Sequence, residues 1–473
     1  MKPVGLRHNS SVSLSFQPLS PLDGRYASQV QELSLYLSEA ALNRARIKVE
    51  IEWLILLANK NIFGDNCYIT EEQARRLRSA VSYFSDTDVA KLAETEARTR
   101  HDVKAVEYFV RDKLTEIDRE DLHELAHFAA TSEDINNLSY ALIIKDAVNS
   151  VWLPKAKQIV AALSELARSY ANVPMLSRTH GQPATPTTMG KEIAVFASRL
   201  TRQINRIEKT DYLGKFSGAT GTYSAHVVAV PTANWPELAQ ELVESLGLKF
   251  NPLTTQIESH DWQAELYTAI AHFNRVLHNL ATDIWSYISI GYFKQIPVKG
   301  ATGSSTMPHK INPIRFENAE ANLEISNALF DVLAATLVTS RLQRDLTDSS
   351  SQRNIGVAFG HSLLALDNIA KGLTEIEVAE SVMAADLAEN WEVLTEAIQT
   401  VIRAEVVSGR SKISNPYDLL KDLSRGKRLT REDLANFILK LDIDQAAKDR
   451  LLVLSPKDYI GLAAKLAQNL STT

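Results

Sequence analysis

The chain has 473 residues, 45% hydrophobic and 23% charged, so it is long enough for two or three domains and has the composition of a soluble globular protein. Its formal net charge of −6 excludes a generally basic surface for nucleic acid or anionic membrane, but local cations could still hold a small anion. Gly contributes only 18 residues, well below its usual share of ~7%, which favours long helices over turn-rich β architecture.

The cellular compartment is constrained by what the chain lacks. The single cysteine, Cys67, cannot form an internal disulfide, which suits a reducing compartment. The first 16 residues contain no apolar run of the kind that a signal peptide needs. No stretch approaches the ~18 apolar residues of a membrane span. We therefore expect a cytoplasmic protein without nucleic-acid or membrane partners.

Helical periodicity dominates the chain from end to end. Short helical patterns such as residues 71–84 come first, and short helices return after about residue 373, where Thr430 followed by Asp433 indicates an N-cap. Between them, three longer segments repeat apolar side chains at steps of three and four: residues 188–212, 262–290 and 315–340. Each would form a helix of ~35–45 Å. No strand–turn–strand alternation stands out.

These patterns predict an all-α protein with three mainly helical domains: residues 1–120, residues 121–373 with a central long-helix bundle, and residues 374–473. Long helices that are apolar on several faces cannot bury them all within one chain. We therefore expect a closed homo-oligomer, most simply a homotetramer, whose central bundle is shared between subunits.

Five polar segments interrupt the helical pattern. They are residues 98–109, 131–137, 177–192, 301–313 and 341–354. Any one of them could be a helix cap, a turn or a solvated face. Five such segments near the ends of long helices favour a single site built from loops, which makes a non-catalytic helical scaffold the weaker alternative.

A zinc hydrolase is the other alternative, because 123-HELAH-127 matches the H-E-x-x-H pattern of zinc proteases. The next 30 residues offer no third His, and apolar neighbours such as Leu122 and Leu125 suggest a packed helix that carries the pair. We therefore expect no metal site.

The segment 301-ATGSSTMPHKINP-313 has the chemistry to close over a dianion. Ser304 and Ser305 follow a Gly, so backbone N–H groups can approach a ligand closely. Lys310 and Asn312 could hold a carboxylate. His180 is a candidate acid or base near neutral pH. Either serine could act as a base if its alkoxide is stabilised.

This segment resembles the signature of the fumarase/aspartase superfamily. Five further segments make the chain similar to the adenylosuccinate lyase family within it: 20-SPLDGRY-26, 99-TRHDVKAVEY-108, 131-TSEDINN-137, 178-RTHGQPATP-186 and 344-RDLTDS-349. The similarity runs from about Ser20 to the C-terminus, and the preceding ~15 residues have no assigned role.

The resemblance implies a C–N lyase of purine nucleotide biosynthesis. Such an enzyme eliminates fumarate from adenylosuccinate to give AMP, and from SAICAR to give AICAR, without a cofactor. The resemblance implies that Ser304 is the general base, His180 the general acid and Glu317 the partner of His180. It also implies active sites built from three subunits of a homotetramer, with His180 and Ser304 on different chains.

The resemblance also implies a set of substrate contacts. The succinyl carboxylates would be held by Lys310, Asn312, Thr131, Ser132 and Gln256. The phosphate would be held by Arg25, Tyr26, Arg344, Ser349 and Arg353, and the base or ribose would meet His101 and Asp102. Arg100 is also implied to bind the substrate. His309 is implied to lie in the site without an assigned role.

Overall fold

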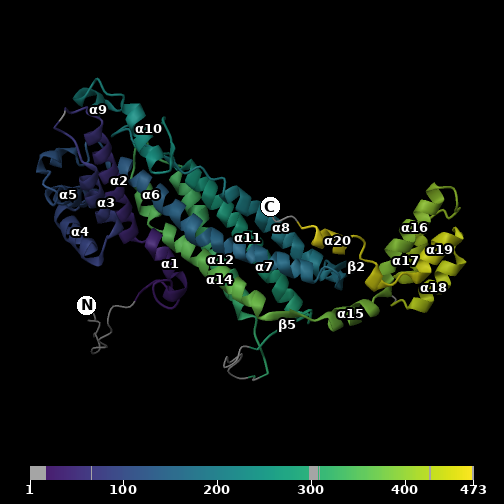
Figure 1. Cartoon of the computed structure of the whole chain (residues 1–473). Helices are drawn as coiled ribbons and strands as arrows, with labels where there is room; N and C mark the ends of the chain where they lie inside the picture. Colours follow the sequence, from purple (N-terminus) through teal and green to yellow (C-terminus); the bar gives the residue numbers. More distant parts are fainter. Residues whose placement is uncertain (1–17, 65, 298–306, 308, 426–427, 471–473) are drawn as a thin grey trace, which may run out of the picture. The chain divides into compact units, whose positions relative to one another are not determined.

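The computed structural model describes residues 18–64, 66–297, 307, 309–425 and 428–470. Most of these residues lie in helices (Figure 1), which confirms the predicted all-α class. The chain divides into two compact units. The first comprises Met1–Val151, Asp211–Asp261 and Ala335–Leu364, and the second comprises Trp152–Thr210, Trp262–Ala334 and Ala365–Thr473. The division into three domains near residues 120 and 373 stays a prediction.

The elements are distributed between the units as follows. The first unit holds α1 (Ala27–Leu37), α2 (Glu39–Asn59), α3 (Glu71–Ser82), α4 (Asp86–Thr99), α5 (Asp102–Thr115), α6 (Ser132–Ala147), α9 (Ser224–Ala229), α10 (Trp235–Ser245) and α13 (Thr347–Gln352). The second holds α7 (Leu153–Ser169), α8 (Met189–Ile207), α15 (Glu380–Ala388), α16 (Thr395–Val407), α17 (Pro416–Ser424), α18 (Arg431–Lys440), α19 (Gln445–Val453) and α20 (Ala463–Gln468). Three helices contribute residues to both: α11 (Asp261–Ser289), α12 (Ile314–Leu337) and α14 (Ile355–Thr374).

The strands form three small two-stranded sheets. Antiparallel pairs join β1 (Pro174–Thr179) to β2 (Gln182–Thr188) and β5 (Phe293–Gln295) to β6 (Ile376–Val378). A parallel pair joins β3 (Leu213–Gly214) to β4 (Lys249–Phe250). None of the described helices is both long and apolar enough to cross a membrane.

Helix α2 forms the centre of the first unit. Most of its residues between Ala41 and Ala58 are buried, and it packs against α5, α6 and neighbouring helices. The Trp53 ring packs on Phe216 with ring centroids 4.2 Å apart, and its indole N–H donates to the Phe128 carbonyl at 3.0 Å. The two charges of α2 that are fully buried, Arg46 and Glu50, must therefore find partners inside the protein.

The three predicted long helices are present in the second unit as α8, α11 and α12. Polar contacts join α11 to both of the others: Arg199 of α8 donates to Asn279 at 2.9 Å, and Arg275 pairs with Asp331 of α12 at 2.6 Å. Their buried residues are mostly apolar, as the spacing of three and four residues predicted, although a buried Asn274–Ser326 hydrogen bond of 3.2 Å also joins α11 to α12.

The β1–β2 hairpin was not predicted, because its strands carry no period-two apolar alternation. Pro183 and Pro186 lie within β2, where the sequence suggested only a turn. Each strand is tied to a helix of the C-terminal part of the second unit. Arg178 of β1 pairs with Asp386 of α15 at 2.7 Å, and Thr185 of β2 donates to Glu396 of α16 at 2.5 Å.

The C-terminal part of the second unit has a small core of its own. Buried side chains of α16 and α18, such as Ile398, Ile402 and Ile438, meet there. The predicted N-cap is confirmed: the Thr430 hydroxyl accepts from the Asp433 N–H at 3.2 Å, and the Asp433 carboxylate accepts from the Thr430 N–H at 2.9 Å.

Helix α8 and the end of α7 are in close contact at Gly190. A Cβ atom there would lie 2.3 Å from the Ala167 carbonyl oxygen and 2.5 Å from the Ala171 nitrogen, which are backbone atoms without freedom to move aside. The Gly190 N–H donates to the Tyr170 carbonyl at 2.9 Å, so the chain after β2 is held against the end of α7.

We expect Gly190→Ala to lower the free energy of unfolding by about 1–3 kcal/mol, the usual cost of overpacking. The midpoint of thermal unfolding should fall by several degrees. Ser198→Ala, at an exposed position of the same helix, should leave the midpoint nearly unchanged. A Gly190→Ala protein at least as stable as the wild type would show that the helices can separate freely here.

Candidate active site

Two of the polar segments predicted to form the site, 98–109 and 131–137, contain the first residues of α5 and α6. Arg100 ends α4 in the left-handed region, with φ 55°, and His101 caps α5 by accepting the Lys104 N–H on Nδ1 at 3.2 Å. Thr131 is the N-cap of α6 and Ser132 its first residue. Arg100 and His101 are exposed, and Thr131 and Ser132 are half-buried, so all four remain accessible to a ligand.

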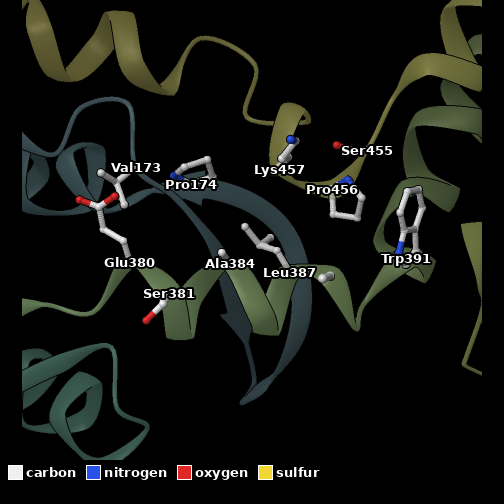
Figure 2. Close-up of a pocket in the computed structure, with 11 residues that line it drawn as sticks. Val173, Pro174, Glu380, Ser381, Ala384, Leu387, Trp391, Ser455, Pro456 and Lys457 are labelled. Carbon is white, nitrogen blue, oxygen red and sulfur yellow. The ribbon is translucent and has the colours of Figure 1, made fainter.

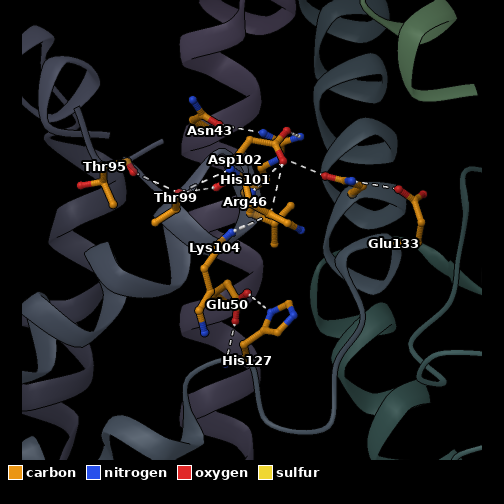
Figure 3. A network of polar contacts seen from close by, with 12 residues as sticks. Asn43, Arg46, Glu50, Thr95, Thr99, His101, Asp102, Lys104, His127 and Glu133 are labelled. Atoms are coloured by element: carbon orange, nitrogen blue, oxygen red, sulfur yellow. Dashed lines mark hydrogen bonds and ion pairs between the residues drawn. The ribbon is translucent and has the colours of Figure 1, made fainter. Parts of the chain in front are cut away.

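Asp102 and Glu133, one from each segment, belong to one network of polar contacts (Figure 3). Asp102 pairs with Arg353 at 3.2 Å, and Glu133 pairs with Arg344 at 3.1 Å. Three of the polar segments found in the sequence, 98–109, 131–137 and 341–354, therefore meet within one compact unit. The two arginines flank α13 in the sequence: Arg344 precedes its first residue, and Arg353 directly follows its last.

The Asp102 carboxyl is held ionised in this network. Burial by itself raises its pKa, but the guanidinium of Arg46, the backbone N–H of Val103 and the guanidinium of Arg353 together lower the pKa below its ordinary value. Arg46 was not among the predicted site residues. The available sequence signal for Arg46 was an Arg and a Glu, Arg46 and Glu50, placed four residues apart among the apolar residues of 41–58.

The start of α6 is anchored by a buried ion pair. Asp134 accepts from Lys215 Nζ at 2.7 Å, and neither side chain is exposed. The same carboxylate accepts from the backbone N–H groups of Ser217 and Gly218 at 2.8 and 3.0 Å. Gln256 donates to the next carbonyl in this segment, that of Ala219, at 2.8 Å. Gln256 thus contacts the segment 215–219, whose other members hold Asp134 at the start of α6.

The other residues predicted to hold the phosphate are Arg25, Tyr26 and Ser349, which also lie in the first unit. Arg25 is exposed, with its guanidinium 5.8 Å from the Tyr26 ring, and Tyr26 directly precedes α1. A cavity of about 180 Å³ has Ser20, Asp23 and Arg353 among its lining residues, so the segment before α1 adjoins Arg353. Ser349 lies in α13, and its N–H donates to the Asp348 carboxylate at 2.6 Å.

In the second unit, His180 occupies the tip of the β1–β2 hairpin. Thr179 pairs with Gln182, which leaves a two-residue turn of His180 and Gly181 with φ of 53° and 75°. Two positive φ values in succession are typical of a type I′ turn, in which Gly is favoured because it lacks a Cβ atom. The turn exposes the His180 imidazole to solvent, at the end of a hairpin that two helices hold.

The signature segment is only partly described. Ser304 and Ser305 lie outside the described residues. His309 and Lys310 are exposed, and the Lys310 N–H donates to the Met307 carbonyl at 3.1 Å. Asn312 is half-buried directly before α12.

Glu317 lies in the first turn of α12, where its carboxylate accepts from the Trp285 indole N–H at 3.1 Å. Within the described part of the second unit, no hydrogen bond or ion pair joins Glu317 to His180. Their partnership therefore stays a prediction.

The H-E-x-x-H pattern does not form a regular helix, so that part of the sequence interpretation is wrong. A 3₁₀ helix, Glu120–Leu125, ends before His127, which has a φ of 60°. His123 Nε2 lies 3.0 Å from the Thr115 hydroxyl, whereas His127 Nδ1 lies 2.6 Å from Glu50 Oε1. The two imidazoles thus have separate partners. Across the described ranges, no group of three or more His, Cys, Asp or Glu side chains could hold a metal ion.

A cavity of about 480 Å³ opens elsewhere in the second unit (Figure 2). Its lining is mostly apolar and includes Val173, Leu387, Pro456 and Trp391, and Lys457 and Glu380 contribute its charged groups. None of the predicted site residues lines it. It is therefore separate from the polar segments that the sequence singled out.

Comparisons with known proteins agree on one family. Residues 24–325 match the family model described as lyase, and residues 340–460 match the one described as adenylosuccinate lyase C-terminal. The chain is 46% identical over 454 residues to an adenylosuccinate lyase of Legionella pneumophila (strain Corby), covering 96% of this chain and 98% of that protein. It is 45% identical over 459 residues to the adenylosuccinate lyase of Escherichia coli (strain K12), covering 96% and 99%.

A solved structure supports the fold independently. The fumarate lyase from Mesorhizobium sp. BNC1 aligns with a TM-score of 0.72 over 93% of this chain and 97% of that one. At 19% sequence identity this likeness concerns the fold alone.

The His127–Glu50 contact predicts a pH-dependent stability. Burial lowers the pKa of the His127 imidazole, but the hydrogen bond and charge of Glu50 outweigh burial and raise that pKa above 6.5. A raised pKa stabilises the fold fully below the unfolded value and ceases to do so as pH rises through the folded value. His127→Gln should therefore lower the midpoint of thermal unfolding more at pH 6 than at pH 9. In a Glu50→Gln background the substitution should cost the same at both pH values, and equal costs in the wild-type background would contradict the assignment.

Proposed function

The chain belongs to the adenylosuccinate lyase family, and from this we infer that it eliminates fumarate from adenylosuccinate to leave AMP, and from SAICAR to leave AICAR. The observation that carries the proposal is the meeting of Arg344, Arg353, His101 and Asp102 in one unit, beside the start of α6. Two guanidinium groups next to the start of a helix suit a phosphorylated substrate. We propose that the enzyme acts in purine nucleotide biosynthesis in the cytoplasm, in line with its single cysteine.

The proposed reaction needs one base and one acid. The base removes a proton from the succinyl Cβ, the electron pair of that C–H bond forms the double bond of fumarate, and the C–N bond breaks. The acid gives its proton to the departing nitrogen. No electron enters or leaves the system, so side chains suffice and no cofactor is needed.

We assign the acid to His180 and the base to Ser304. His180 stands exposed at the tip of a hairpin that is held at both strands, so its imidazole can reach a substrate without a change of fold. Glu317 would orient that imidazole. Ser304 is assigned through the family signature, with Lys310 and nearby backbone N–H groups stabilising the charge that develops on the substrate.

The binding roles follow the charges. Arg344 and Arg353 would hold the phosphate together with Ser349, Arg25 and Tyr26. Lys310 and Asn312 would hold the succinyl carboxylates together with Thr131, Ser132 and Gln256. His101 and Asp102 would meet the base or ribose, and Arg100 would also bind the substrate.

Purified protein should convert adenylosuccinate to AMP with fumarate released in equal amount, as followed by ultraviolet absorbance. Ser304→Ala and His180→Ala should each reduce kcat by about 10²–10⁴-fold, the usual effect of losing a general acid or base. Ser305→Ala is the matched control for the base and should retain far more activity than Ser304→Ala. Full activity of both principal variants would contradict the assigned roles, and absence of turnover by the wild type would contradict the function.

We further propose a closed homotetramer in which each active site takes residues from three chains. Several large apolar side chains on the long helices are unburied in the single chain: Val195 on α8 is 39% exposed, Trp285 on α11 is 42% exposed, and Ile325 and Val332 on α12 are 47% and 59% exposed. Burial of such side chains against copies of the same helices would stabilise a shared bundle. Within this assembly His180 and Ser304 would come to one site from different subunits.

Subunit mixing tests this arrangement. Ser304→Ala and His180→Ala proteins, each inactive alone, would be mixed in equal amounts under conditions that allow subunits to exchange. Random assembly should leave about a quarter of the sites with both residues intact, so activity should rise towards that fraction. Exchange must be verified by mass or labelling. Verified exchange without recovered activity would place the two residues on the same chain.

A further inference from the structure

Arg46 is a buried cation that donates hydrogen bonds to three side chains (Figure 3). Its side chain lies on α2 and the residue is only 1% exposed. Nε donates to Asn136 Oδ1, Nη1 to Asn43 Oδ1 and Nη2 to Asp102 Oδ2, each at 2.9 Å. A guanidinium group so enclosed cannot touch a ligand directly. Its influence on the site must pass through the groups that it holds.

The first of these connections leads to Arg353. Asp102 Oδ2 accepts from Arg46 on the buried side and from Arg353 Nη2 at 3.2 Å on the accessible side. One carboxylate oxygen thus links a fixed guanidinium to one whose side chain is 42% exposed. Because Arg46 fixes the Asp102 oxygen, it also fixes one of the two anchors of Arg353. The other anchor is the exposed carboxylate of Glu39, at 2.6 Å.

The second connection leads to Arg344. The Asn136 amide is oriented from both ends, since its Oδ1 accepts from Arg46 and its Nδ2 donates to Glu133 Oε1 at 2.9 Å. The same Glu133 oxygen accepts from Arg344 Nη2 at 3.1 Å, and Arg344 Nη1 pairs with Asp348 at 2.5 Å. Arg353 is therefore connected to the buried Arg46 through one side chain, and Arg344 through two.

Charge gives Arg46 a second effect on the same site. Arg344 and Arg353 face four carboxylates: Glu39, Asp102, Glu133 and Asp348. These acids hold the arginines in place, but they also repel an incoming phosphate. Arg46 offsets part of that negative charge from a position where water screens it little. Its removal would leave Asp102 without its buried partner and make the surroundings of the phosphate more negative.

We propose that Arg46 is a positioning residue for nucleotide binding, which sets Arg344 and Arg353 for a phosphate group through Asp102 and through Asn136 with Glu133. The proposal rests on the proposed function, because it takes these two arginines as the phosphate contacts. It assigns a role in the site to α2, a helix that contributes none of the contacts implied by the family resemblance.

The test compares binding of AMP with binding of adenosine, which lacks the phosphate, by equilibrium dialysis. Arg46→Met keeps the volume of the side chain but removes the charge and all three hydrogen bonds. It should weaken AMP binding by about ten- to a hundredfold, the effect of losing a hydrogen bond to a charged group, and weaken adenosine binding much less, because adenosine meets only Asp102 of this network. In turnover, KM for adenylosuccinate should rise while kcat changes little, since binding common to ground and transition states is lost.

Arg78→Met is the matched control. Arg78 pairs with Glu52 of the same helix α2 at 2.7 Å, but it contacts no member of the Arg46 network. This variant should bind AMP as tightly as the wild type. Asn136→Ala is the second variant for the case in which Arg46→Met does not fold. It leaves the Arg46–Asp102 pair intact and cuts the connection to Glu133 alone, so it should weaken AMP binding several-fold without affecting adenosine.

The outcomes separate the two proposals. If the wild type neither binds AMP nor consumes adenylosuccinate, the proposed function is wrong. If the wild type binds AMP and the folded Arg46→Met protein binds it equally well, the function stands and the positioning role is overturned. Parallel losses of AMP and adenosine binding would also overturn the positioning role, because they would show a general disturbance of the fold. If Arg46→Met does not fold, unchanged AMP binding by Asn136→Ala overturns it.

Discussion

The start of α6 is the constraint on which the candidate site in the first unit depends. Asp134 and Lys215 form an ion pair with no exposure to solvent, and the Asp134 carboxylate also accepts two backbone N–H groups from residues 217 and 218. Buried charges are tolerated only when they are paired and hydrogen-bonded this fully. The pair therefore fixes where α6 begins. Through that it places Thr131, Ser132 and Glu133, and with Glu133 it places the anchor of Arg344.

The same arrangement recurs on α2, where Arg46 and Glu50 are buried and their partners lie at the edge of the site. Arg46 holds Asp102 and Asn136, and Glu50 holds His127. The rigid groups are inside, and the groups available to a ligand, such as Arg353 and His101, are attached to them from outside. A site whose cations are already oriented loses less side-chain freedom when an anion binds.

In the second unit, the position of a candidate site residue is set by a turn and not by buried charges. His180 owes its position to a two-residue turn with positive φ, and the strands on both sides of that turn are each held by a helix. The imidazole is exposed, yet the backbone beneath it is well anchored. If the proposed tetramer forms as described, His180 would be available to a site that a neighbouring chain completes. In the single chain Glu317 accepts from the Trp285 indole N–H.

The sequence alone determined the features that depend on neighbours along the chain. Apolar side chains at steps of three and four predicted α8, α11 and α12, Thr430 with Asp433 predicted an N-cap, and six short motifs led to the family. The tertiary structure decided which charges meet. Arg46 finds Asp102 and Asn136 at separations of 56 and 90 residues, and no local pattern could pair them. The H-E-x-x-H segment shows the same limit, since Glu50 holds His127 in a left-handed conformation that local propensity does not favour. Helical periodicity repeats every few residues and can be read locally, whereas the pairing of buried charges depends on which distant segments fold side by side.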